Sequence, residues 1–164
     1  MAGVTWVIDS SSLMDIKSKT SNEVRPTLYA RLTFLAGEGR IRLPREVVDE
    51  MKRGAQPRHR DEALEWVVAR EAQICGVEPT VEELRAIMQE VGDVVDHEKD
   101  SGEDDADPYV LALAVKLQAG GLRVRVVTED RKDRQRKVSL TTAAGILGVP
   151  CVPLSGFMRA EGIS

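Results

Sequence analysis

Short apolar runs alternate with longer amphipathic stretches along this chain. Residues 4–12 read V-T-W-V-I-D-S-S-S, in which β-forming side chains with few polar interruptions are typical of a strand buried on both faces of a parallel sheet. Residues 122–128 repeat the pattern as L-R-V-R-V-V-T. The first run stops at Asp9 and the second at Glu129 and Asp130, so each predicted strand delivers an acid at its carboxyl end.

Helical periodicity fills the intervals between these strands. The predicted helices cover residues 13–19, 22–36, 45–53, 61–74, 80–92, 107–119, 141–147 and a short stretch near 157, and brief strands are predicted at 41–43 and 150–154. Pro44 is expected at N1 of its helix, and Thr80 with Glu83 has the signature of a capping box. The alternation predicts one α/β domain over residues 1–164, with a central parallel sheet and a helical insertion at 61–91.

Composition excludes several classes of protein. Charged residues make up 30% of the chain and hydrophobic residues 42%, an ordinary balance for a soluble domain. Cys75 and Cys151 have no C-x-x-C partner, so no zinc site is expected. No signal peptide or membrane span is recognised, and a cytoplasmic location is expected. The net charge of −4 does not indicate a nucleic-acid binder, unless many of the acids gather in one place.

Four acids stand at predicted structural junctions: Asp9, Glu50, Asp107 and Asp130. Each has an ordinary explanation, as a helix cap, a surface acid, a second cap and a turn residue. If the two clear strands are neighbours in a parallel sheet, however, Asp9 and Asp130 emerge side by side. Carboxylates brought together repel one another, and a hard divalent cation such as Mg²⁺ or Mn²⁺ would relieve that repulsion. Ser11 and Thr128 can add hydroxyl groups to the same cluster.

Four segments in order then resemble a known family. V-I-D-S-S-S-L-M, L-P-R-E-V-V-D-E-M, D-P-Y-V-L-A-L-A and V-V-T-E-D resemble the acid-bearing segments of the PIN domain, the metal-dependent nuclease fold of bacterial and archaeal toxin ribonucleases. The closing K-V-S-L-T-T-A-A-G-I-L-G-V-P-C-V resembles the terminal helix and strand of one PIN subfamily. The resemblance implies a three-layer α/β/α fold in which Asp9, Glu50, Asp107 and Asp130 are the catalytic, metal-binding residues.

Two of these placements have neighbours that compete for the role. In D-D-A-D-P, the family pattern picks Asp107, and Asp105 or Asp104 could also reach a metal or its waters. At the fourth position, Asp130 matches the pattern better than Glu129 or Asp133, and strand alternation points Glu129 to the opposite face from Asp130.

The resemblance implies an endonuclease, a hydrolase that cuts RNA phosphodiester bonds with one or two Mg²⁺ or Mn²⁺ ions. A bound divalent ion would lower the pKa of a water and stabilise the leaving 3′ oxygen, which leaves a 5′ phosphate and a 3′ hydroxyl. Two basic stretches are expected to hold the RNA phosphates. The first is Lys52 and Arg53, with Arg58 and Arg60 close behind, and the second is the run from Arg131 to Lys137, which includes Lys132 and Arg134. A solubilising charged loop explains any one of these residues equally well. His59 and His97 are expected to be solvated, not catalytic.

Partners follow from the same resemblance. PIN-type toxins are held by a cognate antitoxin, and many are homodimers. The expected contact surface is the insertion, through Trp66, Val67, Leu84, Ile87 and Met88, although packing on the domain's own core is an equal alternative for Leu84 and Ile87. Leu64, Val67, Val68 and Ala72 are expected to face inward.

Other functions remain open at this level. A PIN-like module could be catalytically inert and bind only metal or a partner, or it could be a housekeeping RNA-processing nuclease. A dehalogenase-like phosphatase would need a second Asp where this chain has Ser11, and a phosphoacceptor receiver would need an acid where it has Ile8.

Overall fold

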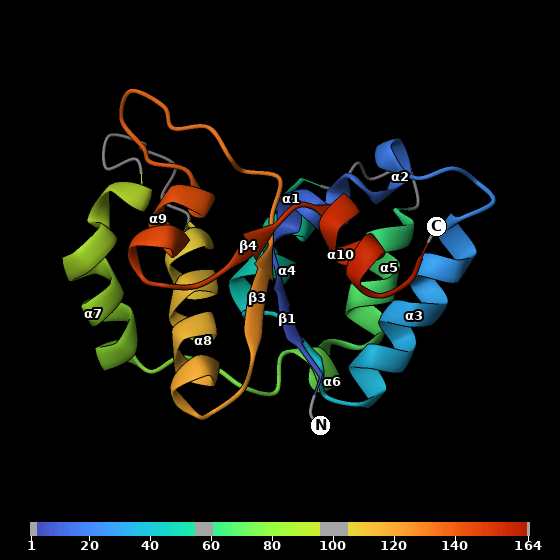
Figure 1. Cartoon of the computed structure of the whole chain (residues 1–164), viewed down its shortest axis with the longest axis horizontal. Helices are drawn as coiled ribbons and strands as arrows, with labels where there is room; N and C mark the ends of the chain where they lie inside the picture. Colours follow the sequence, from blue (N-terminus) through green and yellow to red (C-terminus); the bar gives the residue numbers. More distant parts are fainter. Residues whose placement is uncertain (1–2, 55–60, 96–104, 164) are drawn as a thin grey trace.

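The fold is built on a four-stranded sheet in which every described strand pairing is parallel. The structure is a computed structural model, and it describes residues 3–54, 61–95 and 105–163. In the order β2-β1-β3-β4, the strands are β2 (Ile41–Arg42), β1 (Thr5–Ile8), β3 (Val124–Val127) and β4 (Cys151–Val152). The two apolar runs of the sequence are therefore the two central strands, and they are neighbours (Figure 1).

The register between the central strands fixes where their ends lie. Ile8 is opposite Val127, and the backbone N–H of Asp9 donates to the carbonyl of Val127 at 2.9 Å. The acids that follow β1 and β3 therefore emerge at the same edge of the sheet. At the outer side, β4 is an edge strand as its prolines predicted, since Pro150 and Pro153 flank it and cannot donate to a further ladder.

Helices cover both faces of the sheet. They are α1 (Ser10–Met14), α2 (Ile16–Lys19), α3 (Arg25–Gly37), α4 (Arg45–Arg53), α5 (Glu62–Ala69), α6 (Glu71–Ile74), α7 (Val81–Val91), α8 (Asp107–Ala119), α9 (Leu140–Ile146) and α10 (Leu154–Ala160), with a 3₁₀ turn at Gly92–Val94. In Figure 1, α7 and α8 lie on one side of the sheet and α3, α5 and α10 on the other. The chain thus forms a three-layer α/β/α arrangement.

Alternate side chains of β1 reach the two helical layers. The Trp6 ring meets Phe157 of α10 edge-on, with 4.9 Å between ring centroids, while Val7 points to the opposite face, as strand alternation requires. Both are fully buried, and they belong to one continuous apolar core. This burial on both faces explains why β1 reads as an uninterrupted hydrophobic run.

The helical insertion at residues 61–91 is divided between the two outer layers. Trp66 of α5 donates from Nε1 to Thr33 of α3, at 3.0 Å, whereas Lys116 of α8 pairs with Glu83 of α7 at 2.9 Å. Figure 1 shows the chain passing beneath the sheet between α6 and α7. The expected insertion therefore consists of two separately packed parts, one on each side of the sheet.

Burial on these helices corrects two expectations. Val68 and Ala72 are exposed instead of inward-facing. The buried side of α5 carries Ala63, Trp66 and Val67, and the buried residue of α6 is Ile74. The predicted contact residues Trp66, Val67 and Ile87 belong to the domain's own core. Leu84 is half-buried and packs against that core, and Met88 is half-buried. The alternative of core packing is correct for Leu84 and Ile87.

Local sequence signals predicted some helix ends correctly and others not. The capping box of Thr80 and Glu83 is present, and Asp107 and Pro108 begin α8. Pro44 is the N-cap of α4 and not its N1 residue, while the helix predicted at 13–19 is interrupted at Asp15. In the described part of the chain, every helix is too short or too polar to span a membrane.

Candidate active site

Asp9 is both the cap of a helix and the link between the two central strands. It is 3% exposed, and its Oδ1 accepts from the backbone N–H of Ser10 at 2.9 Å, which caps α1. Its Oδ2 accepts from the hydroxyls of Ser11 at 2.8 Å and Thr128 at 2.9 Å. The cap explanation is therefore correct, but it uses only one of the two carboxylate oxygens.

Burial raises the pKa of Asp9, because a charged carboxylate loses its hydration inside the protein. The hydrogen bonds from Ser11, Thr128 and Ser10 oppose that rise, and the charge of Asp130 adds to it. The two acids at the ends of β1 and β3 therefore interact electrostatically, as expected from adjacent parallel strands.

The three serines after Asp9 have three different roles. Ser10 donates from Oγ to Glu50 Oε1 at 2.9 Å, which brings the acid of α4 to the same edge of the sheet. Ser11 holds Asp9 and accepts from the backbone N–H of Glu129 at 3.0 Å. Ser12 is fully buried, and its hydroxyl has no hydrogen-bond partner among the described residues. Two of the three hydroxyls thus orient carboxylates.

Glu50 is half-buried on α4 and lies in the field of other acids. Burial raises its pKa, the hydrogen bond from Ser10 opposes the rise, and the charges of Asp9 and Asp105 add to it. Glu50 is therefore one member of a group of interacting carboxylates, not an isolated surface acid.

Asp107 is the buried first residue of α8. Its pKa is raised, first by burial and then by the charges of Asp9 and Asp105, while Lys137 opposes the rise. Lys137 Nζ lies 2.7 Å from Asp107 Oδ2 and 3.5 Å from Asp105 Oδ2. Asp105 Oδ1 in turn accepts from the backbone N–H of Asp107, at 2.9 Å. Both acids of this segment that the structure describes thus belong to the cluster, whereas Asp104 lies outside the described residues.

Asp130 and Glu129 turn to different helices. Asp130 Oδ2 accepts from the backbone N–H of Leu140, in the first turn of α9, at 3.0 Å. Glu129 Oε1 instead accepts from the N–H of Leu154, the first residue of α10, at 2.7 Å, and its Oε2 is 3.2 Å from Lys19 Nζ. The charge of Asp130 acts on Asp9. We therefore keep Asp130 as the fourth candidate.

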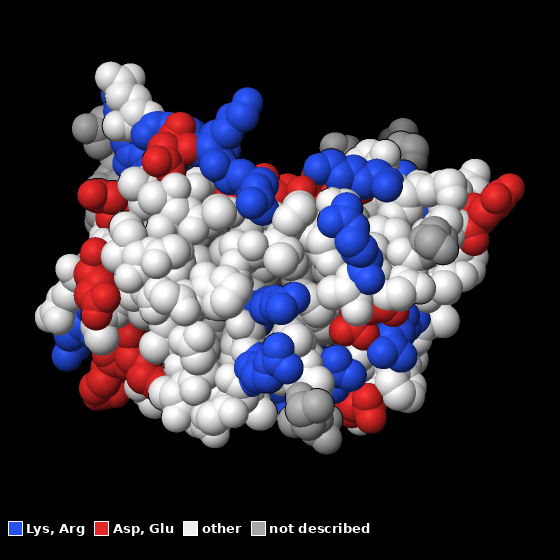
Figure 2. Space-filling view, viewed as in Figure 1, with Lys and Arg blue, Asp and Glu red and all other residues white. Residues whose placement is uncertain are grey.

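The candidate phosphate-binding residues lie around this edge, but not all are turned toward it. Arg131, Lys132 and Arg134 are exposed in the loop that follows Asp130. Figure 2 shows Lys and Arg side chains along the upper edge of the molecule, with acidic side chains between them.

The basic residues of α4 are less close to the acids. Lys52 and Arg53 are exposed at the end of this helix. Lys52 pairs with Glu71 of α6 at 3.9 Å. Because a helix turns by about 200° over two residues, the Lys52 side chain points to nearly the opposite side of α4 from Glu50. Arg58, Arg60, His59 and His97 lie outside the described residues.

The donor set suits a hard cation, although the oxygens are engaged within the protein. Within residues 3–54, 61–95 and 105–163, no group of three or more His, Cys, Asp and Glu side chains stands ready to hold a metal ion. The clustered groups are all oxygen donors, carboxylates with added hydroxyls, which is the chemistry that Mg²⁺ and Mn²⁺ prefer. A divalent ion would offset both the repulsion between these carboxylates and the cost of burying their charge.

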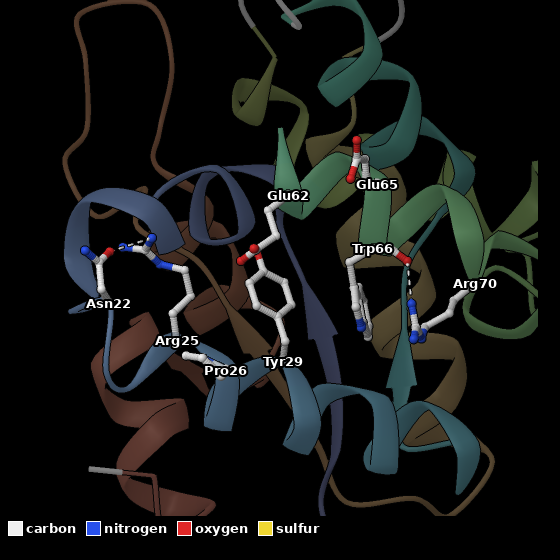
Figure 3. A pocket seen from close by; sticks show the side chains of 8 residues that line it. All are labelled: Asn22, Arg25, Pro26, Tyr29, Glu62, Glu65, Trp66 and Arg70. Carbon is white, nitrogen blue, oxygen red and sulfur yellow. Dashed lines mark hydrogen bonds between the residues drawn. The ribbon is translucent and has the colours of Figure 1, made fainter. Parts of the chain in front are cut away.

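The described surface also has a cavity whose lining does not include the candidate acids. A cavity of about 490 Å³ opens between α3 and α5, and Figure 3 shows Tyr29 and Trp66 lining it. Their ring centroids are 6.4 Å apart, and the guanidinium of Arg70 lies over the Trp66 ring. The residues that line it include none of the four candidate acids.

Sequence reasoning missed the role of Lys137. It was part of a basic run expected to face RNA, and nothing in its local pattern separates it from its neighbours. Yet its ammonium contacts two acids of the cluster. Ser10 was missed too, since its bond to Glu50 spans 40 positions of the sequence.

Comparisons with known proteins place the chain in one family. A search among curated proteins gives no match. The family model described as a domain of unknown function, DUF4411, matches residues 6–164, a span that includes all four candidate acids. The chain therefore belongs to the DUF4411 family.

Proposed function

We propose that this protein is a divalent-metal-dependent endoribonuclease of PIN type. The observation that supports it most directly is the placement of Asp9 and Asp130 after neighbouring parallel strands, where open α/β sheets bind ligands. Glu50 and Asp107 join them from α4 and α8. The order and spacing of the four acid-bearing segments, which resemble those of PIN nucleases, add to this support.

Asp9, Glu50, Asp107 and Asp130 would hold the Mg²⁺ or Mn²⁺. When bound, the ion supplies Lewis acidity and lowers the pKa of a water at the scissile phosphate. Thr128 and Ser11 fix the orientation of the Asp9 carboxylate, and Ser10 fixes that of Glu50. Because these hydrogen bonds already exist in the free protein, little conformational entropy is lost in ordering the two carboxylates when substrate binds.

The basic loop after Asp130 is the proposed substrate-binding surface. Arg131, Lys132 and Arg134 are exposed beside the acids, where they can neutralise phosphates on either side of the scissile bond. We propose RNA as the substrate, in a cytoplasmic protein that acts as the toxin of a toxin–antitoxin module. A cognate antitoxin and a homodimer are proposed partners.

One observation favours a second candidate, an inert PIN-like module. Lys137 neutralises Asp107 and Asp105 from within the chain. A cluster held together by its own lysine could serve stability alone. Metal-dependent cleavage separates the two candidates, because an inert module has none.

The test is cleavage of end-labelled RNA with Mg²⁺ or Mn²⁺, compared with chelator. We expect cuts that leave a 5′ phosphate, and we expect Asp9→Asn and Asp130→Asn to abolish them while keeping the circular dichroism of the fold. The control Glu82→Gln changes an exposed acid of α7 and should cut like the wild type. Full activity of Asp9→Asn would refute the assignment.

The toxin role needs its own experiment. Expression without any neighbouring gene should arrest bacterial growth, and Asp9→Asn should relieve the arrest. Unchanged growth with an enzyme that is active in vitro would instead indicate a housekeeping nuclease.

A further inference from the structure

Lys137 occupies the acid cluster from a segment that belongs to none of the helices or strands around it. Its Nζ lies 2.7 Å from Asp107 Oδ2, and its side chain is only 20% exposed. The Asp107 side chain is 9% exposed and that of Asp105 is 17% exposed. A lysine that only solubilises a loop extends into water, whereas this one is directed inward toward two carboxylates.

The backbone around Lys137 is fixed on both sides. Arg134 and Lys137 exchange backbone hydrogen bonds at 2.7 and 3.3 Å, which closes a tight turn. The N–H of Val138 donates to the carbonyl of Asp93 at 2.9 Å, and the N–H of Ser139 donates to Asp133 Oδ1 at 2.8 Å. The fold therefore places the ammonium group, and only the side-chain torsions of Lys137 are left to move it.

The Lys137 ammonium, 2.7 Å from Asp107 Oδ2, competes with a divalent ion for the negative charge of that carboxylate. Mg²⁺ binds carboxylate oxygens at about 2.0–2.1 Å, so an ion held by Asp107 would be a close neighbour of the Lys137 ammonium. Two cations that close together repel strongly, and the effect is larger in a partly buried site than in water. Binding of metal at Asp107 therefore favours a side-chain conformation of Lys137 in which the ammonium has moved away from that oxygen.

We propose that Lys137 is a resident counter-cation of the acid cluster, and that a divalent metal displaces it from Asp107. This inference rests on the proposed function for the metal site. Lys137 is then a positioning residue that sets metal affinity: it keeps the carboxylates together before metal arrives, and it competes with the metal for Asp107.

The first experiment measures metal affinity by isothermal titration calorimetry with MnCl₂, after treatment with chelator. Lys137→Met removes the competing charge and should bind Mn²⁺ on the order of tenfold more tightly than the wild type. Lys137→Arg keeps the charge and should stay near the wild-type affinity. Lys132→Met removes an exposed charge from the same loop and is the matched control, with less than about a twofold change in affinity.

A second experiment uses the wild-type protein, so it does not depend on the folding of a variant. An amine-acylating reagent is applied with and without Mn²⁺, and the modification of each lysine is followed by mass spectrometry. Displacement should raise the labelling rate of Lys137 several-fold when Mn²⁺ is added, while that of Lys132 stays unchanged.

The outcomes separate this inference from the proposed function. Unchanged or weaker Mn²⁺ binding by Lys137→Met, or unchanged labelling of Lys137, overturns the counter-cation role even if RNA is cut. Displacement of Lys137 without any RNA cleavage supports the counter-cation role and removes the nuclease. No Mn²⁺ binding by any folded variant overturns both.

Discussion

The hydroxyl of Thr128 donates to Asp9 Oδ2 at 2.9 Å and joins the carboxyl ends of β3 and β1. The same Oγ1 accepts from the backbone N–H of Asp130 at 3.0 Å. One side chain thus sets the position of both acids that stand at the ends of the central strands. Thr128 is fully buried, so water does not compete for either bond.

Thr128→Val keeps the shape of the side chain and removes both hydrogen bonds. We expect it to lower the free energy of unfolding by about 1–3 kcal/mol, because a buried carboxylate oxygen and a backbone N–H each lose a partner. Urea denaturation followed by circular dichroism measures the change. The control is Ser12→Ala, which removes a hydroxyl that is equally buried but has no described partner. It should stay within about 1 kcal/mol of the wild type, and an equal loss in both variants would contradict the linking role of Thr128.

The acid cluster should make stability depend on pH. The pKa values of Asp9, Glu50 and Asp107 are raised in the folded protein. As pH rises from about 4, the unfolded chain loses these protons first, so their contribution to stability falls until pH exceeds the folded pKa values. In chelator, Asp9→Asn should therefore gain stability relative to the wild type as pH rises.

Melting temperatures over a pH series test this dependence. At the acidic end, where Asp9 is protonated in both states, the two proteins should differ least. A difference that shrinks as pH rises would show that the Asp9 carboxylate is not destabilised by its surroundings. Added Mn²⁺ should raise the melting temperature of the wild type more than that of Asp9→Asn, because the ion binds the folded state.

Glu161 is expected to stabilise the helical layer that contains α3 and α10. Its side chain is 6% exposed and accepts from Arg31 Nη2 at 2.8 Å, Trp6 Nε1 at 2.9 Å and Arg40 Nη2 at 3.3 Å. Glu161→Gln should lower the free energy of unfolding by about 2 kcal/mol, less than for a fully buried pair because water reaches the arginines.

The matched control for Glu161 is Glu38→Gln. Glu38 also pairs with Arg40, at 3.7 Å, but its side chain is 48% exposed. The change should cost less than about 1 kcal/mol in urea denaturation. Equal costs for the two glutamates would mean that burial does not strengthen the Glu161 network.

Trp66 should stabilise the domain and not a partner contact. Trp66→Ala removes a side chain that is 6% exposed and should lower the free energy of unfolding by about 3–5 kcal/mol. Val68→Ala, on the exposed side of the same helix, should change it by about 0.5 kcal/mol or less. If sedimentation velocity instead shows that Trp66→Ala dissociates an oligomer without loss of stability, α5 is a partner surface after all.

The sequence alone predicted the elements whose signals are local. Thr5–Ile8 and Val124–Val127 are strands because unbroken β-forming residues suit burial on both faces. The capping box at Thr80 and the proline after Asp107 set the starts of α7 and α8, since helix termini are decided by nearby backbone donors. The proximity of Asp9 and Asp130 followed from strand order, because the ends of two adjacent parallel strands emerge at the same edge of the sheet.

Only the tertiary structure decided which distant groups meet. Lys137 resembles its basic neighbours in the sequence, and its contact with Asp107 arises because the turn at Arg134 and the bond from Val138 to Asp93 direct it inward. Ser12 and Ser10 are equivalent in pattern, yet one hydroxyl has no described partner and the other holds Glu50, because two residues of helix turn a side chain by about 200°. Local propensity carries no information about such partners, since they depend on where separate segments come to lie in space.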